Sequence, residues 1–278
     1  MNVLALNSQV AFGHVGNSAA QFALQRLGHE VWGVPTVLFS NHPAHGGHAG
    51  GATEPGRFAA LIDGLAGLGA LGRCDAVCSG YLGDAALAAA VAGAAAAVRA
   101  ANPSAPYLCD PVIGDTARGV YVPDAVREAI VGRLVPAADI VTPNAFELGL
   151  IAGAPVHGLG EAIAACRAVL GLGPQTVVCT SLADQDPGSL MTIALTADAA
   201  YAVRTPKLGG QFYGAGDLMT ALFVGRLLRG GTLAEALSKA VSSTFGVIAA
   251  STGGELALIA AQDEIVAPGR VFAAEPMA

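Results

Sequence analysis

Positive charge is scarce in this chain. Of its 278 residues only 14 are Lys or Arg, against 21 Asp or Glu, and the formal net charge is −7. The chain is acidic overall and contains no run of basic residues, so its composition argues against a nucleic-acid partner. Charged residues make up 13% of the chain and hydrophobic residues 53%, which is ample for a sizeable core in one large α/β domain or two small ones.

A membrane-spanning run and a leader segment are also missing. The longest stretch without charge, residues 31–53, contains two prolines and three histidines, and no segment has the composition of a transmembrane helix. The first residues, MNVLALNSQ, lack the basic region of a signal peptide and enter a strand pattern at once. We therefore expect a cytoplasmic protein with no membrane partner.

The five cysteines form no recognisable motif. Cys74 and Cys78 are too far apart for a CxxC pair, and no other two have the spacing of metal ligands. We expect reduced, mostly buried thiols. Two phosphate-binding motifs are likewise absent, because no GxxxxGK[ST] occurs and the glycines at 214–219 do not complete GxGxxG. These absences argue against Walker-type NTPases and dinucleotide-binding enzymes.

What is present is an alternation of short β-rich runs and helical runs. Strands are expected at residues 3–7, 31–39, 75–79, 106–109, 140–142 and 176–180. Helices are expected at residues 17–27, 57–71, 84–101, 124–134, 144–152, 159–170, 217–228 and 233–251. The alternation predicts an α/β fold with a mostly parallel central sheet flanked by helices on both faces. A hairpin at 190–204 predicts a short antiparallel edge, and residues 1–278 are expected to form one domain.

Polar residues stand at the ends of six predicted strands. They are Asn7-Ser8, Ser40-Asn41-His42, Ser79-Gly80-Tyr81, Asp110, Thr142-Pro143-Asn144 and Thr180-Ser181. Ligands of open parallel sheets bind beyond the carboxyl ends of the strands. One polar group at one strand end is ordinary loop chemistry, but six at corresponding ends predict a single site.

The segment GGQFYGAGDLM at 209–219 places Asp217 between glycines and an apolar helix. Glycines let the backbone approach a ligand closely, and the free N–H groups of a first helical turn bind anions. An acid at this position either caps the helix or acts as a general base beside the anion site. The second interpretation is what transfer of a phosphoryl group to a hydroxyl requires.

Three further groups have two interpretations each. Asn144 and Glu147 form either a capping box or a site whose carboxylate faces phosphates through Mg²⁺ and its waters. Asp110 is either a loop acid or a metal ligand at a strand end. The histidines of HPAHGGHAGG at 42–51 suggest zinc, but a glycine-rich segment is a poor rigid scaffold. We prefer a substrate-covering loop near residues 40–53.

The combination of GAGD with TPNxxE about seventy residues upstream resembles the ribokinase superfamily. The similarity narrows to pyridoxal kinases over nearly the whole chain, in the same order. The segments that carry it are NSQVAFGHVGNSAAQFALQRLG at 7–28, TVLFSNHP at 36–43, SGYLGD at 79–84, CDPVIGD at 109–115, YVP at 121–123 and TPNAFE at 142–147.

This resemblance implies ATP- and Mg²⁺-dependent phosphorylation of the 5′-hydroxyl of pyridoxal, pyridoxine or pyridoxamine, with K⁺ as a monovalent cation and a homodimer as the assembly. By the resemblance Asp217 is the catalytic base beside an anion hole of Gly214, Ala215 and Gly216. The positions that match vitamin contacts are Ser8, His42, Pro43, Ala44 and Tyr81. Those that match nucleotide contacts are Asp110, Tyr121, Thr142, Asn144, Glu147, Thr180, Ser181, Gly210, Gln211, Phe212 and Tyr213, with Asp110 and Glu147 also nearest the metal.

Several positions depart from the family pattern. Pro43 replaces the usual threonine of SNHT, Gln9 a histidine, and Thr180 a lysine found in some bacterial members. In some bacterial members a cysteine near position 120 captures the aldehyde of pyridoxal. This chain has Val120 there, so we expect no such adduct. The alternatives that remain are a hydroxymethylpyrimidine or sugar kinase on the same scaffold and a non-catalytic vitamin carrier.

Overall fold

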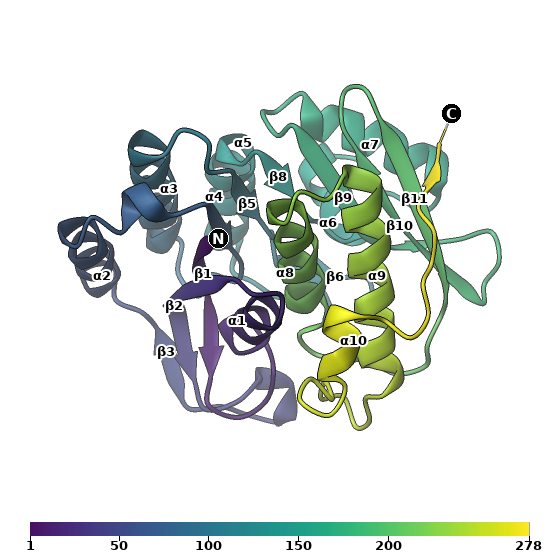
Figure 1. Cartoon of the computed structure of the whole chain (residues 1–278), viewed down its shortest axis with the longest axis horizontal. Coiled ribbons are helices and arrows are strands. Elements are labelled where there is room, and N and C mark those ends of the chain that lie inside the picture. Colours follow the sequence, from purple (N-terminus) through teal and green to yellow (C-terminus); the bar gives the residue numbers. More distant parts are fainter. Residues whose placement is uncertain (278) are drawn as a thin grey trace.

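A ten-stranded sheet forms the centre of the structure, a computed structural model that describes residues 1–277 (Figure 1). The strand order is β12-β11-β10-β9-β8-β5-β4-β1-β2-β3. Its parallel part is formed by β1 (Asn2–Val10), β2 (Glu30–Phe39), β4 (Ala76–Ser79), β5 (Tyr107–Cys109), β8 (Ile140–Val141) and the start of β9 (Thr176–Ala183). The predicted α/β class with a mostly parallel sheet is confirmed.

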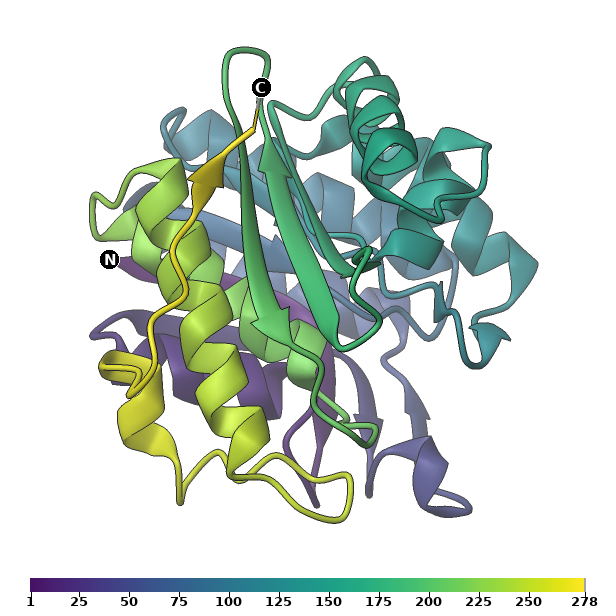
Figure 2. The ribbon, with the colours of Figure 1, turned by 90° about the vertical axis from the view of Figure 1, so that its right-hand side faces the viewer.

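Antiparallel strands close the sheet at both edges. The predicted hairpin is present as β10 (Ser189–Leu195) and β11 (Ala200–Pro206), and it is extended by β12 (Glu275–Pro276). At the other edge β3 (Gly50–Ala52) pairs with β2, so part of the predicted substrate-covering loop is itself sheet. Figure 2 shows the long strands β10 and β11 beside the C-terminal helices.

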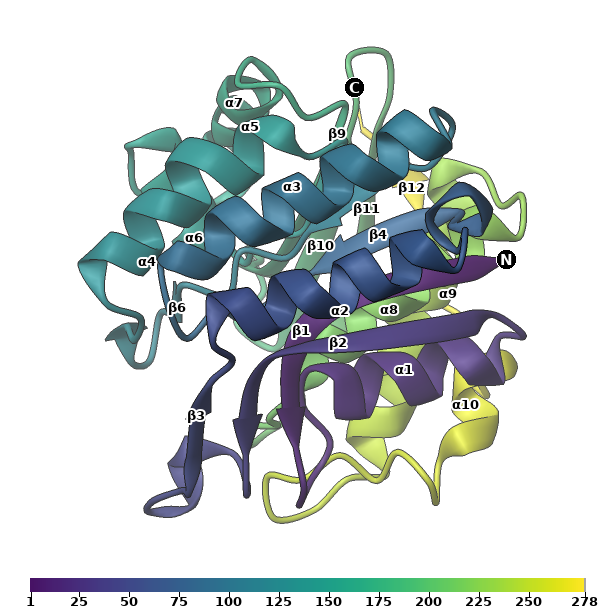
Figure 3. The ribbon, with the colours of Figure 1, turned by 90° about the vertical axis from the view of Figure 1, so that its left-hand side faces the viewer.

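Helices cover both faces of the sheet, as predicted. Buried side chains of one face pack against α2 (Pro55–Gly67), α3 (Ala86–Ala101), α4 (Asp124–Ala129), α5 (Val135–Ala137), α6 (Ala145–Ala152) and α7 (Leu159–Leu170). Those of the other face pack against α1 (Asn17–Arg26), α8 (Ala215–Leu228), α9 (Leu233–Ala249) and α10 (Gln262–Val266). Figure 3 shows the sheet between α2 and α1. No helix within residues 1–277 is long and apolar enough to cross a membrane.

Two strands continue past their predicted ends, and this corrects the placement of polar residues on loops. Strand β1 runs to Val10, and its pairing with β2 shifts register between Asn7 and Gln9, which leaves Ser8 unpaired in a bulge. Strand β9 likewise runs to Ala183, and Ser181 has a φ of 55° inside it. The bulges have a physical role, because an extra residue in a strand redirects side chains without ending the ladder.

Very short elements account for the remaining differences. A two-stranded hairpin, β6 (Gly114–Asp115) and β7 (Gly119–Val120), follows β5, and a 3-10 turn spans Pro43–His45. Another 3-10 turn spans Leu71–Arg73, and a π-helical turn at Ile130–Leu134 continues α4. Strands of two residues have no alternation for a sequence pattern to display.

Candidate active site

Asp217 lies in the first turn of α8, whose N-cap is Gly214. Its Oδ1 accepts a hydrogen bond of 2.8 Å from Asn7 Nδ2, so α8 is joined to the central strand β1. Burial raises the pKa of Asp217, and hydrogen bonds from the backbone of Gly16, the Asn7 amide and its own backbone oppose that rise. A carboxylate with a raised pKa and a fixed position has the properties of a general base.

Two glycines allow the segment before α1 to pack directly against this helix start. Gly16 has a φ of 57°, and a Cβ placed there would lie 2.1 Å from Ser8 Oγ. Gly214 has a φ of 83°, and its Cβ would lie 2.0 Å from the carbonyl oxygen of His14. Neither contact leaves room for a side chain. The first turn of α8, with its free N–H groups, therefore packs directly against the backbone of residues 14–16.

Asn7 connects three of the residues predicted for the site. Besides donating to Asp217, it accepts hydrogen bonds through Oδ1 from the backbone nitrogens of Ser8, at 2.7 Å, and Tyr81, at 2.9 Å. The Tyr81 carbonyl is fixed in turn by Thr36 Oγ1 at 2.6 Å. Asn7 was seen in the sequence only as a polar residue at a strand end. Its role as the centre of this network depends on a contact 210 positions away, which no local pattern reveals.

Asp110 is buried behind the start of α8. Thr220 Oγ1 donates to its Oδ2 at 3.3 Å, and Thr142 Oγ1 lies 2.9 Å from Thr220 Oγ1. Burial is the main cause of the raised pKa of Asp110, followed by the negative charges of Glu147 and Asp217. Thr220, one turn after Gly216, was not singled out in the sequence because it resembles an ordinary helix residue. The network joins β5, the end of β8 and α8.

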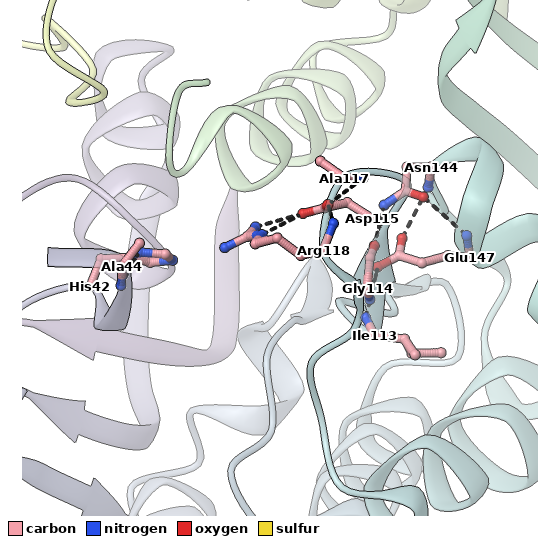
Figure 4. A network of polar contacts seen from close by, with 9 residues as sticks. All are labelled: His42, Ala44, Ile113, Gly114, Asp115, Ala117, Arg118, Asn144 and Glu147. Carbon is pink, nitrogen blue, oxygen red and sulfur yellow. Dashed lines mark hydrogen bonds and ion pairs between the residues drawn. The ribbon is translucent and has the colours of Figure 1, made fainter. Parts of the chain in front are cut away.

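Asn144 and Glu147 form the capping box that begins α6. Asn144 Oδ1 accepts from the Glu147 nitrogen and Glu147 Oε2 from the Asn144 nitrogen, each at 3.0 Å. Glu147 Oε1 accepts the nitrogens of Ile113 at 2.7 Å and Gly114 at 3.2 Å (Figure 4). Burial raises the pKa of Glu147 to about 7, against these three backbone donors. The capping interpretation is confirmed, and both carboxylate oxygens are already used by backbone N–H groups.

The predicted substrate-covering loop contacts the segment before α8. The rings of His42 and Tyr213 are stacked, with centroids 4.3 Å apart, and His45 Nε2 lies 2.9 Å from Glu255 Oε1. The ring of His48 instead packs on Phe39. Burial, and then the positive charge of Arg118, lower the pKa of His42 to about 4. The ring of His45 also lies edge-on to Phe12, so the loop contacts residues from both the N-terminal and the C-terminal part of the chain. The structure places Pro43 and Ala44 in its 3-10 turn.

The other predicted nucleotide residues lie on several segments, of which the one with Thr180 contacts Asn144. Thr180 forms a bridge with Asn144 and donates its N–H to the Pro143 carbonyl at 3.0 Å. Tyr213 is anchored by its N–H on the Gly254 carbonyl at 3.0 Å. Gly210 and Gln211 are exposed, whereas Phe212 packs against the core on the α8 side. Tyr121, after β7, contacts the Arg118 guanidinium.

Comparisons with known proteins show to which family the chain belongs. The family model described as phosphomethylpyrimidine kinase matches residues 70–255. The chain is 47% identical to pyridoxal kinase PdxY of Rubrobacter xylanophilus, over 96% of this chain and 94% of that one. It is 45% identical to pyridoxal kinase PdxY of Deinococcus radiodurans, over 99% and 96%.

A solved structure supports the same assignment. The pyridoxal kinase of Leishmania donovani, in complex with ADP and pyridoxamine, superposes with a TM-score of 0.94 at 30% identity, and the match covers 100% of this chain and 99% of that one. The resemblance noted in the sequence is thereby confirmed. The chain belongs to the pyridoxal kinase family.

Proposed function

We propose that this protein transfers the terminal phosphate of ATP to the 5′-hydroxyl of pyridoxal, giving pyridoxal 5′-phosphate in the salvage of vitamin B6. Pyridoxine and pyridoxamine are proposed as further substrates. The observation that carries the proposal is the placement of Asp217 at the N-terminus of α8, held by Asn7 and joined to Gly16. This placement sets a general base beside an anion-binding helix N-terminus, and phosphoryl transfer to an alcohol needs both groups.

The vitamin is proposed to bind on the β1 side of Asp217. Ser8 and Tyr81 are both fixed by Asn7 there and are assigned to the pyridine ring. The loop with His42, Pro43 and Ala44 lies above them and excludes water from the ring. Burial keeps the His42 imidazole neutral near pH 7, because its pKa is lowered to about 4, so this ring acts by stacking and hydrogen bonding and carries no charge.

Asp217 takes the proton of the 5′-hydroxyl as the new P–O bond forms, a contribution of roughly 10²–10⁴-fold for general-base action. The N–H groups of Gly214, Ala215 and Gly216 stabilise the oxygens of the phosphoryl group in transit. Because the transition state of phosphoryl transfer is loose, the position of Asp217 matters more than its basicity. The rigid connection to Asn7 supplies that position.

The nucleotide is proposed to lie along Tyr121, Thr142, Asn144, Thr180, Ser181 and residues 210–213, with its phosphates toward α8.

Magnesium prefers one or two carboxylates together with phosphate oxygens and water. Asp110 provides one buried carboxylate, whereas Glu147 uses both oxygens on backbone N–H groups and reaches an ion only through water. Within residues 1–277 no group of three His, Cys, Asp or Glu could hold a metal ion, so Asp110 would hold Mg²⁺ together with phosphate oxygens. When bound, Mg²⁺ neutralises phosphate charge. K⁺, a homodimer and a cytoplasmic location are proposed from the family.

Steady-state phosphorylation tests the proposal. The purified protein is mixed with MgATP, K⁺ and pyridoxal, and pyridoxal 5′-phosphate is followed by its absorbance. We expect Asp217→Asn to keep ATP binding and to lose turnover by roughly 10²–10⁴-fold. Unchanged turnover in this variant would remove Asp217 from the mechanism.

One alternative has an observation in its favour. The family model that matches residues 70–255 is described as phosphomethylpyrimidine kinase, so a hydroxymethylpyrimidine is the second candidate substrate. ADP release with hydroxymethylpyrimidine or a sugar, and none with pyridoxal, would select a different kinase. Pyridoxal binding without ATP-dependent product would select a carrier.

A further inference from the structure

Arg118 occupies the turn between β6 and β7, and its side chain is held from two directions. Its Nε and Nη2 lie 2.8 and 2.7 Å from Asp115 Oδ2, and its guanidinium lies 5.0 Å from the centre of the Tyr121 ring. Asp115 Oδ1 also accepts the backbone N–H of Ala117 and of Arg118, which closes the turn. The guanidinium is therefore positioned before any ligand binds, although 40% of the side chain remains exposed.

The hairpin that carries Arg118 begins at the proposed phosphate site. Glu147 accepts the N–H groups of Ile113 and Gly114, and Asn144 Nδ2 donates to the Gly114 carbonyl at 2.8 Å. At the other end the guanidinium points toward His42 (Figure 4). Its positive charge contributes to the lowered pKa of His42. Arg118 thus stands between the residues assigned to the nucleotide and the loop assigned to the vitamin.

The charge of the site makes this position significant. The negative charges of Glu147 and Asp217 both act on Asp110, yet the proposed substrate carries several negative charges. Among the Lys and Arg side chains of residues 1–277, Arg118 is the one with a contact to a residue of the proposed site, through Tyr121. A guanidinium is suited to phosphate because its planar N–H fork bonds two oxygens at once.

We propose that Arg118 is a further catalytic residue, whose guanidinium binds the phosphoryl group in transit and then the 5′-phosphate of the product. This inference rests on the proposed function. In the step, the bond from the terminal phosphorus to the ADP oxygen breaks with its electron pair on ADP. A bond from that phosphorus to the vitamin 5′-oxygen forms, and the hydroxyl proton goes to Asp217. In this step the Arg118 guanidinium gives up one of its two contacts with Asp115, or keeps both and donates its remaining N–H groups to the phosphate.

The test compares Arg118→Ala and Arg118→Lys with a matched control. Arg127 also forms an ion pair with an aspartate three residues earlier, Asp124, at 3.1 Å, but on α4 away from the site, so Arg127→Ala removes the same chemistry elsewhere. We expect Arg118→Ala to lower kcat about 10- to 100-fold, the loss typical of one contact to a charged group, and to leave KM for pyridoxal within about twofold. The kcat of Arg118→Lys should lie between those of Arg118→Ala and the wild type, and the kcat of Arg127→Ala should equal that of the wild type.

A binding measurement gives a second readout that does not depend on turnover. The affinities for pyridoxal 5′-phosphate and for pyridoxal are measured by calorimetry in the absence of ATP. We expect Arg118→Ala to weaken only the phosphorylated ligand, by about tenfold or more. Equal affinities in Arg118→Ala and wild type, or turnover equal to that of Arg127→Ala, would overturn the proposal. A wild-type protein that makes no pyridoxal 5′-phosphate would instead refute the proposed function.

Discussion

The two sides of the site differ in how they are held. On the side proposed for the phosphates, Asp110, Thr142 and Thr220 are buried and joined by hydrogen bonds, and buried Glu147 accepts backbone N–H groups of Ile113, Gly114 and Asn144. On the side proposed for the vitamin, the turn at 43–45 is exposed, and His42 and His45 hold it through ring contacts with Tyr213 and Phe12 and one contact with the Glu255 carboxylate. The phosphate side is built before any ligand arrives, whereas the vitamin side is held by contacts that can be released.

This difference matches the separate tasks of the two sides. A phosphoryl group in a loose transition state is stabilised by donors and charges that are already in position. A ring that must enter and leave needs a cover that opens, and weak contacts permit that. Substitutions on the phosphate side should therefore change kcat and stability, and those on the vitamin side chiefly KM for pyridoxal.

Beyond Asp217→Asn, the largest effect is expected from Gly214→Ala. The new Cβ would lie 2.0 Å from the His14 carbonyl oxygen, so the start of α8 must move away from residues 14–16. We expect kcat to fall about 100-fold, since small displacements of a catalytic group cost this much. Gly28→Ala is the matched control, because Gly28 has a similar φ of 85° with nothing near its Cβ. Equal losses in the two variants would show that backbone strain alone is responsible.

A pH-dependent effect is expected from Glu147→Gln. The pKa of Glu147 is raised from 4.5 to about 7, so the folded chain binds a proton that the unfolded chain releases between these values. The contribution of this group to the free energy of unfolding is therefore present below about pH 4.5 and is lost as the pH rises through 7. Urea titrations from pH 4.5 to 8 should show this fall in wild type and a smaller fall in Glu147→Gln, because Asp110 and Asp217 also have raised pKa values. Glu235→Gln, which alters the exposed capping box of α9, should retain the full fall.

A smaller effect is expected from Glu255→Gln. The contact with His45 is partly exposed, and such pairs contribute about 1 kcal/mol or less. KM for pyridoxal should rise no more than about fivefold, with kcat unchanged. A double-mutant cycle with His45→Ala should show that the two losses do not add. Additive losses would mean that the loop is held by other contacts.

The smallest effect is expected from Pro43→Thr. Pro43 stands at the first position of the 3-10 turn, where a missing N–H costs nothing. The substitution supplies a hydroxyl for the vitamin, so KM for pyridoxal should fall about two- to fivefold, the value of one neutral hydrogen bond. An unchanged KM would show that the loop has adapted to proline and binds the ring without this donor.

The sequence predicted the phosphate side better than the connections that hold it. The start of α8 and the capping box of α6 were visible because a glycine turn, a cap residue and an apolar helix are local signals. Thr220 and Arg118 were not singled out, and Asn7 was seen only as one of the polar strand-end residues, because their partners lie far away in sequence or on strands of two residues. The predicted C-terminal ends of β1 and β9 were wrong for a related reason. Polar residues in the sequence suggest that a strand ends, but a bulge lets the pairing continue past them. Which residues act on the substrates remains a prediction.

The hydrogen bond between Asn7 and Asp217 joins residues 210 positions apart. A growing chain therefore exposes β1 long before the helix that carries the base has been synthesised. Contacts of such separation form late in folding, because a long loop must close before they contribute. Asp217 takes its final place only when α8 docks on β1, so a chain that ends at β11 lacks the carboxylate that we propose as the base.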